Sequence, residues 1–402
     1  MGLISDLKEV EDLTTRALPD NPDASALVYR KPEVRKAVPG AIWTGQIGTA
    51  NALIRLPKKE LWNGKLMIAG TAAVRTEYCL DYLLSDIVLQ RGYAYAACDK
   101  GTPGLTLRDP EKSMSEWSGN YEKLTNEAIR LVQNFYQEPL KRVYISGISN
   151  GGFITRRMLE EYPQLFDGGA EWEGVLWHPE YRHFLTTIPE CLDWYPIYRN
   201  FRGDRTVQER STALEHLTDA GLHPLSDPYW DKYYQTYWAL TLWLYGRGLD
   251  PDWETFKPEW SNAMIGEKSP LVNYPWQERS EQLRKSIQPF ANTGSIGKPL
   301  LSVAGNWDCL IPFKHNAKGY ADLVQKQGKG NLHRSYEIAR GNHVEGLYNE
   351  YLGDQQCVYP YYEAALQHLE NWVEKSIEPP VSGYYEHIDA FAPRMDLFTA
   401  KR

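Results

Sequence analysis

The sequence lacks several features that mark particular classes of protein. Residues 1–8 contain no apolar core of a secretory signal, and no stretch reaches the roughly 18 apolar residues that span a bilayer. No run of Lys and Arg is long enough to follow a phosphate backbone, and the formal net charge is -8. We therefore expect a cytoplasmic protein that binds neither membranes nor nucleic acids.

Cysteine is also scarce, and its spacing carries no ligand pattern. No Cys-x-x-Cys pair or His/Cys ligand spacing occurs, and an odd number of cysteines is typical of a reduced compartment. The sequence therefore predicts free thiols and no metal site. The cysteines are Cys79, Cys98, Cys191, Cys309 and Cys357.

Aromatic residues, by contrast, are abundant, with 14 Trp and 27 Tyr. Many lie between residues 178 and 290, where five of them follow a spacing of i, i+3, i+4, i+7 and i+8 that predicts one face of a helix. These five are Trp230, Tyr233, Tyr234, Tyr237 and Trp238. We interpret this stripe mainly as packing, with a few rings reaching a ligand. The candidate substrate-binding residues are Trp177, Trp230, Tyr234 and Trp238.

Strands and helices alternate along much of the chain. Short apolar runs at 65–70, 93–98 and 142–146 are each followed by a helical pattern, which predicts parallel β-α-β units. After a sixth strand expected at 174–177, the alternation stops, and it resumes at 298–305. A chain of 402 residues accommodates one core with one insertion.

The predicted organisation follows from this interruption. Residues 1–40 form an N-terminal arm, residues 41–177 and 291–402 form the α/β core, and residues 178–290 form an aromatic-rich helical cap inserted after the sixth strand.

The sharpest local signal is the segment Gly-Ile-Ser-Asn-Gly-Gly at 147–152, which lies between a predicted strand and a predicted helix. A serine in this context is typical of a nucleophile elbow, whose tight turn leaves no space for side chains at the flanking glycines. The alternative is a plain glycine-rich turn. We predict Ser149 as a nucleophile.

A serine hydroxyl becomes a good nucleophile only when a base removes its proton and a carboxylate orients that base. After a nucleophile elbow, the acid is expected next along the chain and the base after it. Asp308 follows the strand at 298–305, and His343 follows the next strand. We therefore predict Asp308 as the acid and His343 as the base. Glu171 and Glu173, near the sixth strand, are the alternative acids.

Acyl transfer also needs two hydrogen-bond donors for the developing oxyanion. We expect the backbone N–H of Asn150 to be one donor, because it follows the nucleophile. The second should come from the loop at 70–73, where Thr71 is our candidate. The alternative is that this loop only makes a tight connection between a strand and a helix.

Together, the segment 147–152, Asp308 and His343 resemble the α/β-hydrolase superfamily over residues 41–376. The Ser-Asn-Gly-Gly step and the large insertion are similar to those of the tannase and feruloyl esterase group, and the step is also similar to that of 3-hydroxybutyrate oligomer hydrolases. Tannase-group enzymes usually place cysteines beside the serine and the histidine, where this chain has Ile148 and Val344. The resemblance implies a mostly parallel sheet with helices on both faces and no cofactor.

The expected activity is hydrolysis of a small-molecule carboxylic ester through an acyl-enzyme, with an aromatic or hydroxy-acid ester as the substrate. Two alternatives remain open. The same triad cleaves amide, peptide or carbon–carbon bonds in other enzymes, and a hydrolase relative can also bind ligands without catalysis. A homodimer is compatible with the sequence.

Overall fold

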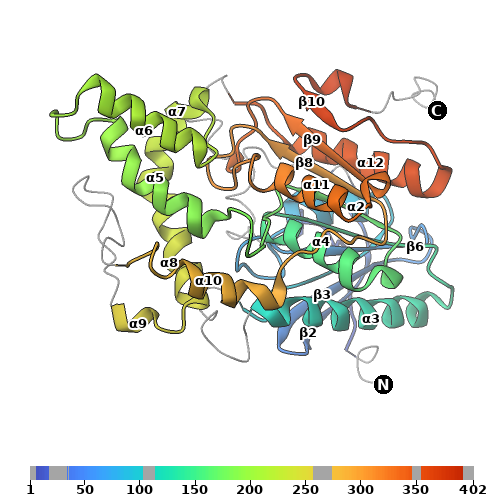
Figure 1. Ribbon diagram of the computed structural model, residues 1–402. Coiled ribbons are helices and arrows are strands. Elements are labelled where there is room, and N and C mark those ends of the chain that lie inside the picture. The colour runs from blue at the N-terminus through green and yellow to red at the C-terminus, as the bar shows by residue number, and fades with distance from the viewer. Residues whose placement is uncertain are drawn as a thin grey trace.

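The computed structural model describes residues 6–17, 34, 36–102, 114–256, 274–345 and 355–392. Within these ranges the chain forms a ten-stranded sheet with the order β1-β2-β3-β5-β4-β6-β7-β8-β9-β10 (Figure 1). The strands are β1 (Lys8–Val10), β2 (Gly40–Ile47), β3 (Ala50–Pro57), β4 (Lys65–Gly70), β5 (Ala94–Cys98), β6 (Arg142–Ile148), β7 (Gly168–Trp172), β8 (Leu300–Gly305), β9 (His333–Ile338) and β10 (Gly383–Tyr385).

The pairing of the strands changes once across the sheet, from antiparallel to parallel. The pairs β1–β2, β2–β3 and β3–β5 are antiparallel. Every pair from β5 to β10 is parallel. The central strands β5 and β8 are buried along their whole length, as expected for parallel strands that are covered on both faces. The predicted mostly parallel α/β architecture is therefore confirmed.

Helices cover both faces of this sheet. One face packs against α3 (Trp117–Tyr136), α4 (Asn150–Glu161) and α11 (Ala317–Lys326), and the other against α2 (Asp86–Gln90) and α12 (Tyr359–Lys375). Neighbouring residues of β4 divide between the two cores, because side chains alternate across a strand. Leu66 and Ile68 pack in the first core, whereas Met67 and Ala69 pack in the second.

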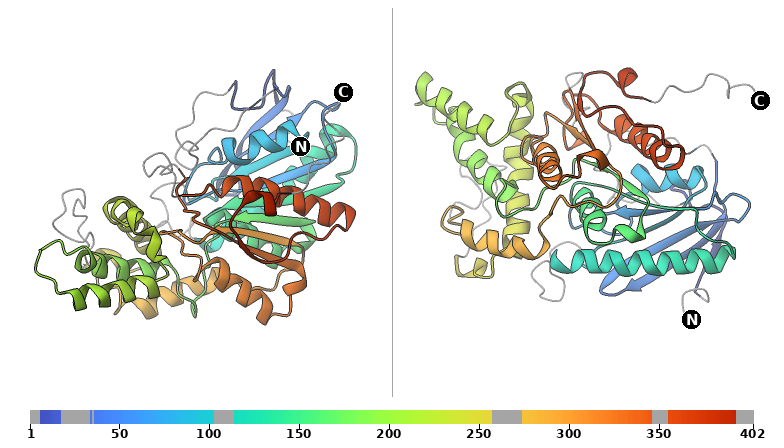
Figure 2. Two further views of the ribbon diagram at one scale, coloured as in Figure 1. Left: turned by 90° about the horizontal axis from the view of Figure 1, so that it is seen from above. Right: turned by 45° about the vertical axis from the view of Figure 1, so that its right-hand side comes forward.

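The chain between β7 and β8 is helical and lies to one side of the sheet, coloured green to orange in Figures 1 and 2. We call its described residues, 178–256 and 274–290, the helical insertion. No helix in the described ranges has the length and apolar character needed to cross a membrane. The elements of the insertion are α5 (Phe184–Tyr198), α6 (Val207–Asp219), α7 (Asp227–Lys232), a π-helix (Tyr233–Tyr237), α8 (Trp238–Leu249), α9 (Trp253–Phe256) and α10 (Ser280–Ile287).

Three strands differ from the sequence-based expectation. The sixth strand, expected at 174–177, lies instead at Gly168–Trp172, where two glycines and a buried glutamate conceal the apolar pattern of a strand. The N-terminal arm contributes β1, and the C-terminal segment contributes β10 beside β9. Both edge strands have three mostly exposed residues, so neither shows a readable pattern. Most of the expected arm lies outside the described residues.

Candidate active site

Ser149 occupies the turn between β6 and α4. Its backbone has φ 58° and ψ -121°, a conformation that non-glycine residues rarely adopt. The turn is too tight for side chains at the flanking glycines. A Cβ on Gly151 would lie 1.8 Å from the carbonyl oxygen of Gly70, and a Cβ on Gly147 would lie 2.4 Å from the same atom. The structure thus places the predicted serine in the strained strand-to-helix turn that a nucleophile elbow requires.

The predicted acid and base are in direct contact. Nδ1 of His343 lies 2.8 Å from Oδ2 of Asp308. The other oxygen of Asp308 accepts the backbone N–H groups of Leu310, at 2.8 Å, and Ile311, at 2.7 Å. These donors hold the carboxyl group of Asp308 in place, so that it can accept the Nδ1–H of the imidazole and leave Nε2 as the proton acceptor.

Ser149, Asp308 and His343 all follow the carboxyl ends of parallel strands, where open α/β sheets carry their sites. All three residues are buried. Among the residues that the structure describes, neither Oγ of Ser149 nor Nε2 of His343 has a hydrogen-bond partner. Within the described ranges, the structure thus brings His343 into contact with Asp308 but shows no hydrogen bond between His343 and Ser149.

The two alternative acids have different surroundings. Glu171 forms a fully buried ion pair with Arg156, at 2.6 Å. Glu173 lies beside the base, with Oε2 3.4 Å from Nδ1 of His343. Asp308 is closer to the imidazole and is held by more donors, so the geometry favours Asp308 as the acid.

The contacting atoms of Glu173, Asp308 and His343 all lie within 4.8 Å of one another. In the described ranges, these three residues form the group whose ligand types and spacing could hold a metal ion. Nδ1 of His343 already bonds Asp308, however, so the arrangement is explained by a hydrogen-bonded pair. All five cysteines of the chain are free thiols and take no part in this group.

The backbone N–H groups of the two expected oxyanion donors have different hydrogen-bond partners. The backbone N–H of Asn150 belongs to the first turn of α4, whose N–H groups have no partner within the helix. The N–H of Thr71, however, donates to the hydroxyl of Tyr121 at 2.9 Å and is not free for an oxyanion. The N–H of the next residue, Ala72, contacts only the sulfur of Cys79 at 3.3 Å, and a thiol is a weak acceptor. The geometry therefore favours Ala72 over Thr71.

The four aromatic residues expected to bind substrate are buried in the structure. Trp177, Trp230 and Trp238 are fully buried, and Tyr234 is only 4% exposed. Each indole N–H of the three tryptophans has an internal acceptor: Oδ1 of Asn150 for Trp177, Oγ of Ser226 for Trp230 and the carbonyl of Cys309 for Trp238. Their rings and indole N–H groups are thus engaged inside the protein, and contact of these residues with substrate stays a prediction.

Aromatic residues of the helical insertion form hydrogen bonds with the neighbours of the triad candidates. The hydroxyl of Tyr245 in α8 accepts a hydrogen bond from Nδ2 of Asn150, the residue after the serine. The hydroxyl of Tyr233 donates to Oδ1 of Asn342, the residue before the histidine. With the bond from Trp238 to the residue after Asp308, the insertion contacts a neighbour of every triad candidate. Sequence reasoning missed the roles of Tyr233 and Tyr245, because no local signal reveals such long-range contacts.

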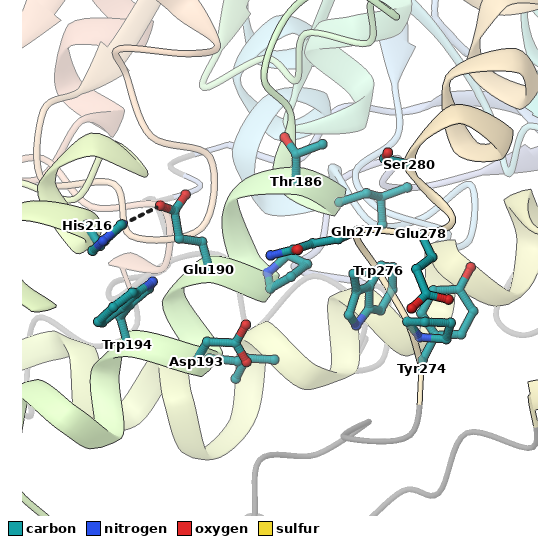
Figure 3. A pocket seen from close by; sticks show the side chains of 14 residues that line it. Thr186, Glu190, Asp193, Trp194, His216, Tyr274, Trp276, Gln277, Glu278 and Ser280 are labelled. Atoms are coloured by element: carbon teal, nitrogen blue, oxygen red, sulfur yellow. Dashed lines mark hydrogen bonds and ion pairs between the residues drawn. The ribbon is translucent and has the colours of Figure 1, made fainter.

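A cavity of about 740 Å³ lies within the insertion, between α5, α6 and residues 274–280 (Figure 3). His216 is hydrogen-bonded to Glu190, with 3.1 Å between Nδ1 and Oε1, as the dashed line in Figure 3 marks. Trp194 stacks on the same imidazole with 3.9 Å between the ring centres. None of the residues that line this cavity is a predicted site residue. Cavity size alone would therefore not have located the triad candidates.

The arrangement of strands, helices and the serine turn is that of the α/β-hydrolase fold, and comparison with solved structures confirms it. The chain is similar to an esterase from Aspergillus oryzae (15% identity, 93% of this chain and 86% of that one, TM-score 0.56). It is also similar to feruloyl esterase B from Aspergillus oryzae (14%, 93% and 87%, TM-score 0.54) and to tannin acyl hydrolase from Aspergillus niger (12%, 93% and 83%, TM-score 0.54). The expected resemblance to the tannase and feruloyl esterase group is thereby confirmed at the level of the fold.

The sequence comparisons are narrower. No family model matches the chain. A probable feruloyl esterase from Arthroderma benhamiae is 27% identical over 146 residues, which is 33% of this chain. The match spans only 26% of that relative's length.

Proposed function

We propose that this chain is a serine hydrolase that cleaves carboxylic esters, with Ser149 as nucleophile, His343 as general base and Asp308 as the supporting acid. The observation that carries the proposal is the bond of 2.8 Å between His343 and Asp308, at the same edge of the sheet as a serine held in a strained turn. The esterase and feruloyl esterase names of the similar proteins support the same class of reaction.

In the proposed mechanism, Oγ of Ser149 attacks the ester carbonyl while Nε2 of His343 takes its proton. The backbone N–H of Asn150 and that of Ala72 stabilise the negative oxygen of the tetrahedral intermediate. The intermediate collapses when His343 returns the proton to the leaving alcohol, which gives an acyl-enzyme. Water, deprotonated by the same imidazole, then releases the acid. No step requires a cofactor.

We further propose that the substrate is a small-molecule ester of an aromatic acid, held between the core and a cap formed by residues 178–290. The similarity to a feruloyl esterase and a tannin acyl hydrolase supports an aromatic acyl group. Hydroxy-acid esters remain the second substrate type. The cytoplasmic location and the homodimer stay predictions.

Labelling with a fluorophosphonate tests the nucleophile directly, because such probes react with activated serines. The wild-type protein should be labelled at Ser149, as located by peptide mass spectrometry, and Ser149→Ala should not be labelled. Ser146→Ala is the matched control, since Ser146 lies on the same strand with its Oγ bonded to the carbonyl of Ala170 at 2.7 Å. Wild-type protein that stays unlabelled, or is labelled elsewhere, would contradict the proposal.

A substrate panel tests the class of bond and the acyl group. We expect higher kcat/KM for aryl esters of aromatic acids than for the matching acetates. Turnover of aminoacyl arylamides without turnover of any ester would identify an amidase or peptidase instead. Faster hydrolysis of acetates than of aromatic esters would overturn the aromatic substrate while leaving the ester hydrolase in place.

A further inference from the structure

Glu173 is a buried carboxyl group that the proposed mechanism does not use. It follows β7, and its backbone N–H donates to the carbonyl of Val303 in β8 at 2.8 Å. Its Oε2 lies 3.4 Å from Nδ1 of His343, the same nitrogen that bonds Asp308 at 2.8 Å. One imidazole N–H therefore faces two carboxyl groups, which come from the ends of two different strands.

The backbone of Glu173 is held in an unusual conformation at this point. Its φ of 49° lies in the left-handed region, which disfavours residues with a Cβ. Such a conformation persists only where the surrounding structure enforces it, and it is found mostly at functional sites. Here it coincides with the contact between Glu173 and His343.

Glu173 also lacks the partner that a buried carboxylate normally requires. Its side chain is fully buried, and neither oxygen makes a hydrogen bond of ordinary length and angle within the described ranges. The backbone N–H of Gly305 and the indole N–H of Trp172 are nearby donors that offset only part of the cost of this burial. Glu171, two residues earlier, is equally buried but pairs with Arg156 at 2.6 Å. An ionised carboxylate with so few donors is costly to bury, so Glu173 is stable there as the neutral acid.

The charged and titratable neighbours of Glu173 act in the same direction. Burial, followed by the negative charges of Asp308 and Glu345, raises the pKa of Glu173 well above its usual range. The groups that face it are the imidazole of His343, the carboxyls of Asp308 and Glu345, and the phenol of Tyr233. Burial raises the pKa of Tyr233 most, and the charges of Cys309, Asp308 and Glu173 add to this effect. Burial and these charges therefore favour the neutral acid form of Glu173.

We propose that Glu173 is a reserve acid for His343: a positioning residue that orients the imidazole when the carboxyl group of Asp308 is removed. Without Asp308, Glu173 is the carboxyl group of this cluster that remains beside Nδ1, and it accepts the Nδ1–H of His343. Removal of Asp308 also takes away one of the negative charges that, after burial, raise the pKa of Glu173. This inference rests on the proposed function, because it requires His343 to act as the base.

The test is a double-mutant cycle read by the rate of fluorophosphonate labelling at Ser149. Asp308→Ala should keep a measurable labelling rate, and adding Glu173→Gln should lower that rate by about a further tenfold or more, the usual worth of a charge-assisted hydrogen bond. In the presence of Asp308, Glu173→Gln should change the rate by less than about twofold, since the two effects are coupled. Asp308→Asn, which keeps an acceptor for the loop amides, replaces Asp308→Ala if the latter fails to fold.

Glu160→Gln is the matched control in the Asp308→Ala background. Burial raises the pKa of Glu160 as well, but its carboxyl lies outside the cluster of Glu173, Asp308 and His343 and accepts the backbone N–H groups of Thr293 and Gly294. This substitution removes an acid of the same type and should leave the residual labelling rate unchanged within about twofold.

The pH dependence separates orientation of the imidazole from a structural effect. In Asp308→Ala, the acidic limb of the labelling rate should include the ionisations of both Glu173 and His343, whereas the double variant should show only that of His343. Equal losses from Glu173→Gln in both backgrounds, with an unchanged acidic limb, would overturn the inference and leave the proposed function intact. Wild-type protein that is not labelled at Ser149 would overturn both.

Discussion

The contact between the helical insertion and the serine turn leads to a quantitative prediction for Tyr245→Phe. The hydroxyl of Tyr245 accepts a hydrogen bond from Nδ2 of Asn150, and Oδ1 of Asn150 accepts the indole N–H of Trp177 at 3.0 Å. These two bonds hold the side chain of Asn150, whose backbone N–H we propose as an oxyanion donor. The substitution removes one bond, and the phenylalanine ring retains the packing against Trp177 and Phe184.

The expected loss of stability follows from the buried side-chain amide of Asn150, which loses its hydrogen-bond acceptor in this variant. A buried donor left without a partner costs about 1–3 kcal/mol, so the free energy of unfolding should fall by that amount. If Asn150 also shifts its backbone, stabilisation of the transition state decreases as well. A loss of about 1 kcal/mol there lowers kcat/KM by about fivefold. Urea unfolding and ester hydrolysis measure the two effects separately.

Tyr136→Phe is the matched control for this substitution. The Tyr136 hydroxyl is also buried and donates to the carbonyl of Pro57 at 2.6 Å, in the core beside α3. Tyr136→Phe should therefore lower stability by a similar amount and leave kcat/KM of the folded protein unchanged. If both variants lose the same fraction of kcat/KM, the contact between the insertion and the serine turn has no role in catalysis, and the reasoning is refuted.

Three further predictions concern stability. Arg156→Met leaves Glu171 buried without its cation and should lower the free energy of unfolding by about 3–5 kcal/mol in urea titrations; an unchanged value would contradict the ion pair. Gly151→Ala places a Cβ 1.8 Å from the carbonyl oxygen of Gly70 and should abolish soluble expression or sharply lower the melting temperature. Burial raises the pKa of Asp86 from 3.8 to about 6, so the native state binds this proton more tightly than the unfolded state and stability falls as the pH rises from about 4 to about 6. Asp86→Asn should remove up to about 3 kcal/mol of that fall, and an unchanged pH profile would count against the raised pKa.

Much of the fold could be predicted from the sequence, because it depends on local patterns. Apolar runs such as residues 65–70 and 300–305 mark strands that are covered on both faces, and the intervening helical patterns require parallel pairing. The serine turn is likewise encoded locally, since Gly147 and Gly151 are needed wherever two backbones approach so closely. The order of Ser149, Asp308 and His343 along the chain follows from this topology.

The tertiary structure alone decided which polar groups meet. Glu171 and Glu173 are indistinguishable by type and position in the sequence, yet one faces Arg156 and the other faces His343. In the same way, the hydroxyl of Tyr121 occupies the N–H of Thr71, and the carbonyl of Cys309 accepts the indole N–H of Trp238. The physical reason is that periodicity specifies which side of an element is buried, whereas the donor or acceptor found there comes from a segment distant in the sequence and is fixed only when the segments pack.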